Sequence, residues 1–143
     1  MAALTKARQT RSRDRHINSL CLAANAKVFS GSLVMRNAAG NLTPGAAAVG
    51  CRGVGKARDT YDNTGGAAGD VVGEYENGVY EFDNSTSTDA IANADIGNTA
   101  YIVDDHTVAK TNGSATRSPA GIIVGIDAVT GGVWIDFIAG NLA

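Results

Sequence analysis

The residues of this chain that could carry out chemistry are few and scattered. Its two histidines are His16 and His106, and the second lies in the run Asp104-Asp105-His106-Thr107. Carboxylates and imidazole are metal ligands, but neighbouring residues of an extended chain point to opposite faces, so at most alternate ones could converge. We therefore predict a solvated turn between two strands here, and no metal site.

No nucleophile has a recognisable partner. Ser118 stands before Pro119, outside any Gly-x-Ser-x-Gly context. Catalysis requires a nucleophile beside a base, or carboxylates in an apolar setting, and the sequence shows neither arrangement. We expect a protein that is not an enzyme, without catalytic residues, cofactor or small-molecule substrate.

A glycine-rich segment, Gly65-Gly66-Ala67-Ala68-Gly69-Asp70, has the composition of a phosphate-binding loop. It lacks the Gly-Lys-Ser/Thr ending of that motif and does not open a helix, and the carboxylate of Asp70 would repel a phosphate. The segment is therefore predicted to be a tight turn into the following strand.

The first 15 residues are basic and nearly without apolar side chains after Leu4, which predicts a flexible, extended arm ahead of a single β-rich domain over residues 16–143. The arm could bind nucleic acid, lie along an acidic protein surface, or remain a solvated tail. Nucleic acid is disfavoured because the rest of the chain is acidic and no aromatic residue interleaves the cations. The cations are Lys6, Arg8, Arg11, Arg13 and Arg15.

Composition predicts one small domain with a thin core. The chain has 143 residues, and its 44% hydrophobic fraction includes 24 alanines. Eighteen glycines and two prolines favour many short strands over long helices. Residues 1–58 hold ten Lys or Arg and one acid, whereas residues 59–143 hold two and thirteen. This charge asymmetry favours self-assembly or docking onto a larger surface.

The two cysteines, Cys21 and Cys51, have no zinc-ligand spacing with the histidines and are predicted to be reduced core thiols. The apolar run at residues 20–24 is shorter than the roughly 7–15 residues of a secretory h-region. No stretch approaches the roughly 18 apolar residues of a membrane span, so we expect neither a secretion signal nor a membrane anchor.

Short apolar runs separated by turn residues predict about eight strands. The clearest local signal is Asn77-Gly78 between two alternating runs, which predicts a type I′ hairpin. Near the end of the chain, Trp134 alternates with Val133 and Ile135, which predicts one buried face and one contacted face within a second hairpin. The predicted strands are residues 27–29, 33–36, 49–55, 71–76, 79–83, 100–104, 121–126 and 133–138.

Only residues 88–94 read as helical, with Thr88 capping a single turn before Gly97. Residues 38–50 are predicted to be a loop. Hairpins without long crossovers indicate an all-β fold, a small antiparallel barrel or sandwich; the sequence leaves open which.

A succession of motifs over residues 16–138 resembles the capsid cement, or head decoration, proteins of tailed bacteriophages, especially Mu-like and related siphophages. No single piece is a catalytic signature, and the likeness comes from their order and spacing. The motifs are Phe29-Ser30-Gly31-Ser32-Leu33-Val34, Gly40-Asn41-Leu42-Thr43-Pro44-Gly45, Val49-Gly50-Cys51, residues 62–70, Gly78-Val79-Tyr80-Glu81-Phe82, Asp95-Ile96-Gly97, Tyr101-Ile102-Val103-Asp104-Asp105-His106-Thr107-Val108, Ala120-Gly121 and Val133-Trp134-Ile135.

This resemblance implies a structural virion protein that is assembled in the bacterial host cytoplasm and binds the outer surface of the finished head as an oligomer. Its implied partners are the major capsid protein and other copies of itself, a trimer being favoured over a dimer. The basic arm is not part of the resemblance, and its role is inferred from charge alone. We expect the arm cations, Tyr75, Tyr80 and Trp134 to form the partner contacts; the alternative is a nucleic-acid-binding accessory protein acting through the arm.

Overall fold

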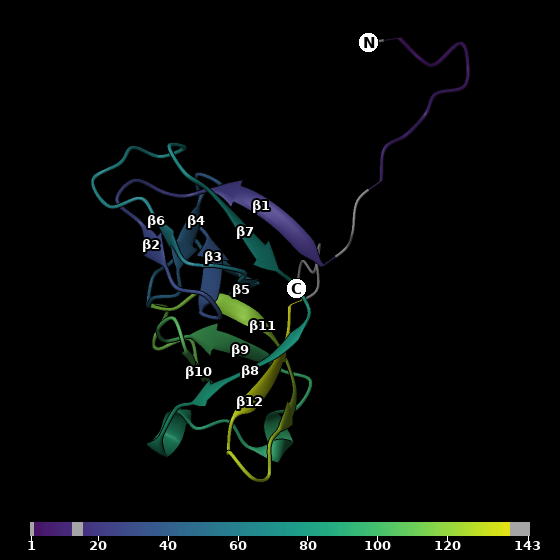
Figure 1. Ribbon diagram of the computed structural model, residues 1–143. Helices are drawn as coiled ribbons and strands as arrows, with labels where there is room; N and C mark the ends of the chain where they lie inside the picture. Colours follow the sequence, from purple (N-terminus) through teal and green to yellow (C-terminus); the bar gives the residue numbers. More distant parts are fainter. Residues whose placement is uncertain (1, 13–15, 138–143) are drawn as a thin grey trace.

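The protein consists of a five-stranded sheet stacked on a small closed barrel (Figure 1). The computed structural model describes residues 2–12 and 16–137. Strands make up 41% of the structure and helices 5%. The prediction of an all-β fold, an antiparallel barrel or sandwich, is confirmed: antiparallel sheets and a small closed barrel are present, and twelve strands replace the expected eight.

The five-stranded sheet is antiparallel throughout and occupies the upper half of Figure 1. A two-stranded ribbon of β2 (Lys27–Val28) and β6 (Tyr61–Asp62) lies beside it. The order across the sheet is β1 (Ile17–Cys21), β7 (Val72–Glu76), β5 (Arg52–Ala57), β3 (Leu33–Arg36) and β4 (Leu42–Pro44).

The barrel is closed by its shortest strand, β10 (Thr107–Ala109). This strand pairs in parallel with β8 (Val79–Asn84) and antiparallel with β9 (Thr99–Ile102). The remaining barrel pairs are antiparallel, and they include the predicted hairpin near the end of the chain. The order around the barrel is β10 (Thr107–Ala109), β8 (Val79–Asn84), β12 (Val133–Asp136), β11 (Pro119–Ile126) and β9 (Thr99–Ile102).

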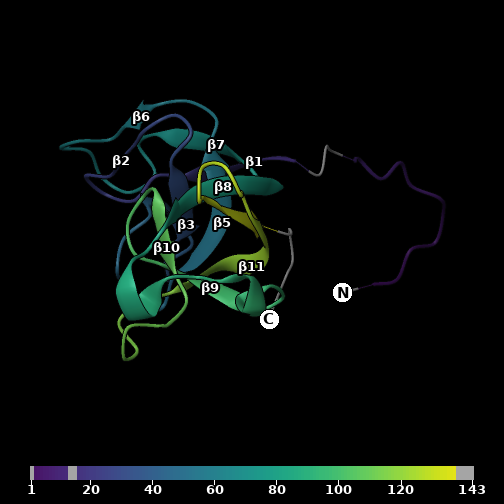
Figure 2. The same ribbon diagram turned by 90° about the horizontal axis from the view of Figure 1, so that it is seen from below.

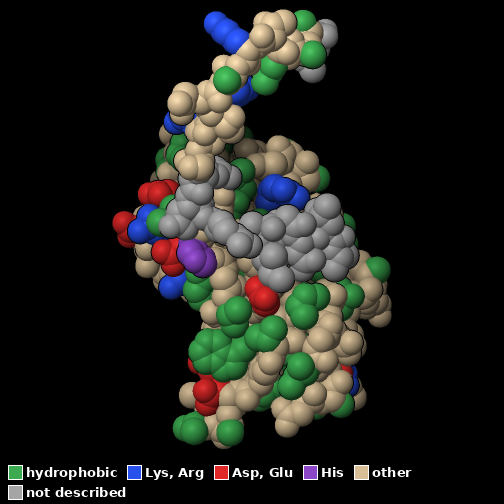
Figure 3. All heavy atoms as spheres, turned by 90° about the vertical axis from the view of Figure 1, so that its right-hand side faces the viewer, with side chains coloured by type: hydrophobic (Ala, Val, Ile, Leu, Met, Phe, Trp, Pro, Cys, Tyr) green, Lys and Arg blue, Asp and Glu red, His purple; other side chains and the backbone are tan. Residues whose placement is uncertain are grey.

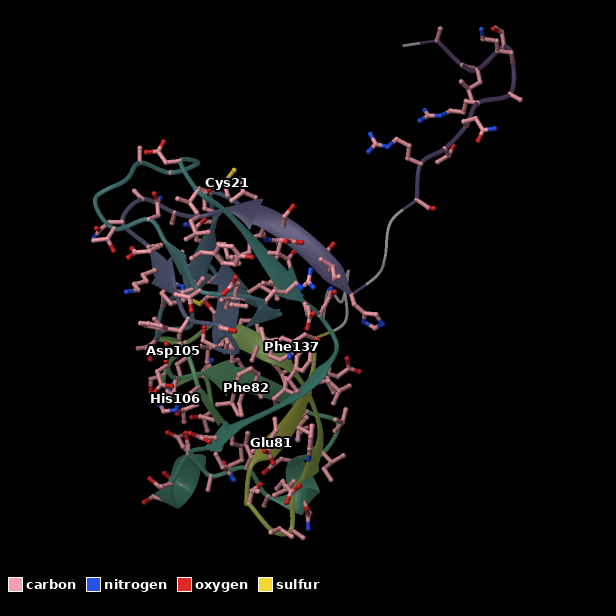
Figure 4. The ribbon with its side chains drawn as sticks, viewed as in Figure 1. Cys21, Glu81, Phe82, Asp105, His106 and Phe137 are labelled. Carbon is pink, nitrogen blue, oxygen red and sulfur yellow. The ribbon has the colours of Figure 1, made fainter. Side chains whose placement is uncertain are left out.

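Strand β3 divides the interior into two cores because it is buried on both faces. Leu33 and Met35 pack with the barrel interior, which contains the edge-to-face pair Phe82 and Phe137 (Figure 4). Val34 faces the opposite way, into a smaller core between the sheet and the β2–β6 ribbon. The continuous apolar run that predicted this strand therefore reflects burial from two sides.

Two glycines in β5 allow close backbone contacts, Gly53 with the barrel and Gly55 with β7 of the same sheet. A Cβ atom on Gly53 would lie 2.6 Å from the carbonyl oxygen of Ala120 in β11, a distance that no side chain tolerates. Gly55 has φ of +143°, and a Cβ atom there would lie 1.9 Å from the carbonyl oxygen of Glu76. Backbone packing at both positions thus requires glycine.

The predicted hairpin at Asn77-Gly78 is wrong, because β7 and β8 belong to different layers. Neither residue adopts a positive φ. The Asn77 N–H donates to His16 O at 2.9 Å, and the Asn77 side-chain oxygen accepts from the Asn18 amide at 3.0 Å. The carbonyl of Gly78 instead accepts from the N–H of Phe137. The chain therefore passes from sheet to barrel at this dipeptide.

The predicted helical turn at residues 88–94 is replaced by two 3₁₀ turns, η1 (Ser87–Asp89) and η2 (Asn93–Asp95). Between them Ile91 is buried in the barrel core, and its backbone N–H and C=O are both bound by the Asn84 side chain at 2.9 Å. The buried Ile91 thus separates the two turns. The residue capping η1 is Thr86, and Thr88 lies within the turn.

Other local predictions need correction. The loop predicted at residues 38–50 contains β4, and strands β1, β4, β6 and β10 were not anticipated. Both cysteines are free, but Cys21 is exposed, because Leu20 and Leu22 occupy the inward positions on either side of it. The glycine-rich segment at residues 65–70 is a pair of turns before β7, as predicted.

The close approach at Gly55 gives the first prediction. Gly55→Ala should reduce the free energy of unfolding by at least about 3 kcal/mol, because backbone strain and overpacking combine. Gly31→Ala is the control: its φ of +81° is also positive, but nothing lies within 4 Å of a new Cβ, so a loss of about 1 kcal/mol is expected. Equal losses in urea unfolding would contradict the tight β5–β7 contact.

Candidate interaction surface

The basic segment at the start of the chain stands away from the folded body in both ribbon views (Figures 1 and 2). Residues 2–12 form neither helix nor strand, and Lys6, Arg8 and Arg11 are exposed. Arg13 and Arg15 lie outside the described residues. These three described cations are thus accessible to an acidic partner, and partner binding by the arm stays a prediction.

The two tyrosines expected at a hairpin tip lie in different layers. Tyr75, on β7, is half-buried against the smaller core. Tyr80, on β8, packs against Phe137 with 6.4 Å between ring centroids, and the Lys56 ammonium lies 4.8 Å from its ring centre. Burial, followed by the negative charge of Glu76, raises the pKa of Tyr80. The structure therefore does not bring these tyrosines together on one outer surface.

Trp134 points outward from the barrel, as the alternation of β12 predicted. Val133 and Ile135 are fully buried, whereas Trp134 is 37% exposed. Its cross-strand partners are Glu81 on β8 and Gly125 on β11. A Cβ atom on Gly125 would lie 3.9 Å from the indole Cδ1, so the ring rests beside the bare glycine backbone. The indole is supported on one side and open to solvent on the other.

Three exposed aliphatic side chains lie on the two strands that flank β12 or on a turn bonded to one of them. Val79 is diagonal to Trp134 across the β8–β12 pair, and Val124 occupies the bulge where β11 pairs with β12. Ile96 lies in the turn joined to β11 by the bond from Gly97 N–H to Ile123 O. They are 46%, 43% and 48% exposed, respectively. We call Trp134 and these three residues the Trp134 face. Figure 3 shows hydrophobic side chains on the lower half of the molecule.

The turn between β11 and β12 carries one more exposed apolar side chain. Val129, within the turn, is 94% exposed. The Asp127 carboxylate accepts the N–H groups of Thr130 and Val129, and these bonds lower its pKa. Glu81, labelled in Figure 4, accepts from the Thr130 hydroxyl at 2.6 Å. The turn is thus fixed before any partner arrives.

Sequence reasoning found Trp134 but missed its neighbours. The outward position of Val79 was available from the alternation of β8, in which Phe82 faces inward. Val124 could not be assigned a face, because the bulge between Ile123 and Gly125 interrupts the alternation of β11. Ile96 lies in a turn, where no periodic signal exists.

The Asp104–His106 segment forms the predicted bend between β9 and β10. Because the chain bends, one ligand atom from each of Asp104, Asp105 and His106 lies within 4.8 Å of the others, contrary to the expectation for an extended chain. His106 Nδ1 lies 2.9 Å from an Asp83 carboxylate oxygen, and Nε2 lies 3.5 Å from Asp104 (Figure 4 labels His106 and Asp105). The histidine thus joins this bend to β8 at the barrel seam.

A pH dependence follows from this pairing. The Asp83 hydrogen bond, then the Asp104 charge, raises the pKa of His106. The stabilisation is therefore complete below the ordinary histidine pKa, about 6.5, and is lost as pH rises through the raised value. Asp83→Asn should lower the imidazole pKa measured by NMR titration, while Asp59→Asn, in a different turn, should leave it unchanged. An unaltered titration in Asp83→Asn would refute the pairing.

The described residues contain no helix both long and apolar enough to cross a membrane. In comparisons with known protein families, with characterised proteins and with solved structures, the chain matches none of them. The assignment of a function therefore rests on the surfaces and residues described above.

Proposed function

We propose that this protein is a structural cement protein that binds the outer surface of an assembled phage head and stabilises it. The observation that carries the proposal is the Trp134 face, an exposed aromatic side chain among exposed aliphatic ones on a closed barrel. The succession of motifs that resembles head decoration proteins supports the same function. The proposal gives the protein no substrate and no cofactor.

The chemistry of the Trp134 face is that of a protein contact. Exposed apolar groups gathered on one side mark binding surfaces, and tryptophan is among the residues that dominate interface energies. The indole is held by the β11 backbone and the adjoining turn by Asp127 and Glu81, so little conformational freedom is lost on binding. The face can therefore bind a partner surface without rearrangement of the barrel.

When an oligomer binds to a repeating shell, several weak contacts form together, and the overall affinity exceeds that of each contact. We propose homo-oligomers, with a trimer favoured over a dimer, seated on the major capsid protein. Lys6, Arg8, Arg11, Arg13 and Arg15 then lie along acidic surface of a neighbouring subunit, ordering as they bind. Assembly takes place in the bacterial host cytoplasm, and the finished site is the exterior of the virion.

Sedimentation of the native protein from its source lysate, before and after nuclease treatment, tests this function. The cement function predicts that the protein sediments with nuclease-resistant megadalton particles, at near-stoichiometric abundance to one major shell protein. Loss from the fast fraction after nuclease would instead indicate the alternative function, nucleic-acid binding through the arm. A small species under both conditions would contradict both functions.

The role of the Trp134 face is tested separately on heads stripped of the protein. Trp134→Ala should weaken rebinding by about 2 kcal/mol, or roughly thirtyfold in Kd, because an aromatic anchor is removed. Phe29→Ala is the matched control, since Phe29 is 54% exposed beside the β2–β6 ribbon and outside the face.

Val129→Asp is a second variant that spares the fold, because this side chain is almost fully exposed. It should also weaken rebinding, since a charge would be buried against the partner. Full rebinding of both Trp134→Ala and Val129→Asp would show that another surface makes the contact.

A further inference from the structure

The Trp134 face has acidic residues at its rim. Glu81 is the direct cross-strand partner of Trp134, and Asp136 is the next outward residue on β12. No Lys or Arg occurs in any of the five barrel strands. In the described part of the chain neither carboxylate forms a salt bridge, and the bond that Glu81 accepts from the Thr130 hydroxyl leaves its charge in place. The apolar face is therefore bordered by negative charge that no described cation neutralises.

The open side of the Trp134 indole can also accept a cation. Tryptophan attracts a cation placed over its ring more strongly than the other aromatic side chains do. The rings of Phe29 and Tyr80 each have a lysine ammonium nearby, 5.1 and 4.8 Å from the ring centres. No Lys or Arg of the described ranges lies over the indole. The indole and the acidic rim thus both favour a partner that brings positive charge together with an apolar group.

The beginning of the basic arm has this combination. Leu4, Lys6 and Arg8 occupy alternate positions, so in an extended chain their three side chains point to the same side. Leu4 is 72% exposed, and both cations are exposed as well. The segment stands away from the folded body (Figures 1 and 2). It therefore offers one apolar side chain and two cations to a neighbouring molecule.

We propose that residues 4–8 of one copy bind the Trp134 face of a second copy. Leu4 then packs on the aliphatic side chains of the face, while the two cations contact the indole and the acidic rim. A second copy is favoured over the same copy, because the arm points away from its own body and has neither glycine nor proline at which to reverse direction. The contact joins different surfaces of two copies, so it can close into the ring of a trimer. The inference rests on the proposed function, which supplies the homo-oligomer.

The chain contains its own probe, because Trp134 is its single tryptophan. We expect the purified full chain to associate with rising concentration in sedimentation velocity, and the indole fluorescence to shift to shorter wavelength as the ring leaves water. The double substitution Lys6→Glu and Arg8→Glu, the arm variant, should weaken association at least tenfold. Arg36→Glu with Lys110→Glu is the matched control, because it changes the same charge at exposed residues outside the arm and the face. It should leave association unchanged.

Val79→Arg, the face variant, should also weaken association at least tenfold, because a cation replaces an apolar group of the face. It spares the fold, since residue 79 is exposed and lies opposite Asp136, with which arginine can pair across the strands. In an equimolar mixture, the intact arm of the face variant can bind the intact face of the arm variant. The mixture should therefore associate and shift its fluorescence, although neither variant does so alone.

Three outcomes would overturn the proposal. These are a wild-type chain that stays monomeric up to about 1 mM, an association that the arm variant leaves unchanged, or a mixture that does not associate. A fluorescence shift at monomeric mass, lost in the arm variant, would place the arm on the face of its own copy and would also overturn it. Because these measurements use purified protein without phage heads, their failure is distinct from failure of the cement function, which co-sedimentation with particles tests.

Discussion

The close contact between the five-stranded sheet and the barrel is the constraint on which the rest of the structure depends. It requires a bare backbone at Gly53, directly against Ala120 of β11. It also places Leu33 and Met35 of β3 inside the barrel core, so that the sheet supplies part of that core. One side of the barrel, around Ala120 of β11, is therefore covered, whereas Val79 of β8, Val124 of β11 and Trp134 of β12 are exposed.

The same contact also orders the loop that leads into β5. Ser118 directly precedes β11, and its buried hydroxyl holds residues 48 and 51, which lead into Arg52. The chain segment that enters β5 is thereby tied to the barrel. The residues between the sheet and the barrel include glycine and other small side chains, so little apolar surface is buried there. Hydrogen bonds to the loop backbone hold the loops in place instead.

Patterns that depend on adjacent residues could be predicted from the sequence. The alternation of residues around Trp134 correctly predicted that this side chain faces outward. In a strand that is buried on one side, alternation alone determines which side chains face outward. Asn77-Gly78 has the local pattern of a hairpin, but β7 pairs with β1 and β5 while β8 pairs with β12 and β10. The pairing of Arg36 with Arg52 depends on a register shift between Val34 and Met35, which no local pattern specifies.

The Trp134 face differs in chemistry from the rest of the chain segment that carries it. Burial of the Trp134 face against a partner would supply non-directional affinity. Residues 59–143 hold thirteen acidic residues against two basic ones, so this part of the chain is strongly negative. An apolar face on a segment of net negative charge therefore favours a partner surface that is apolar at its centre and not itself acidic.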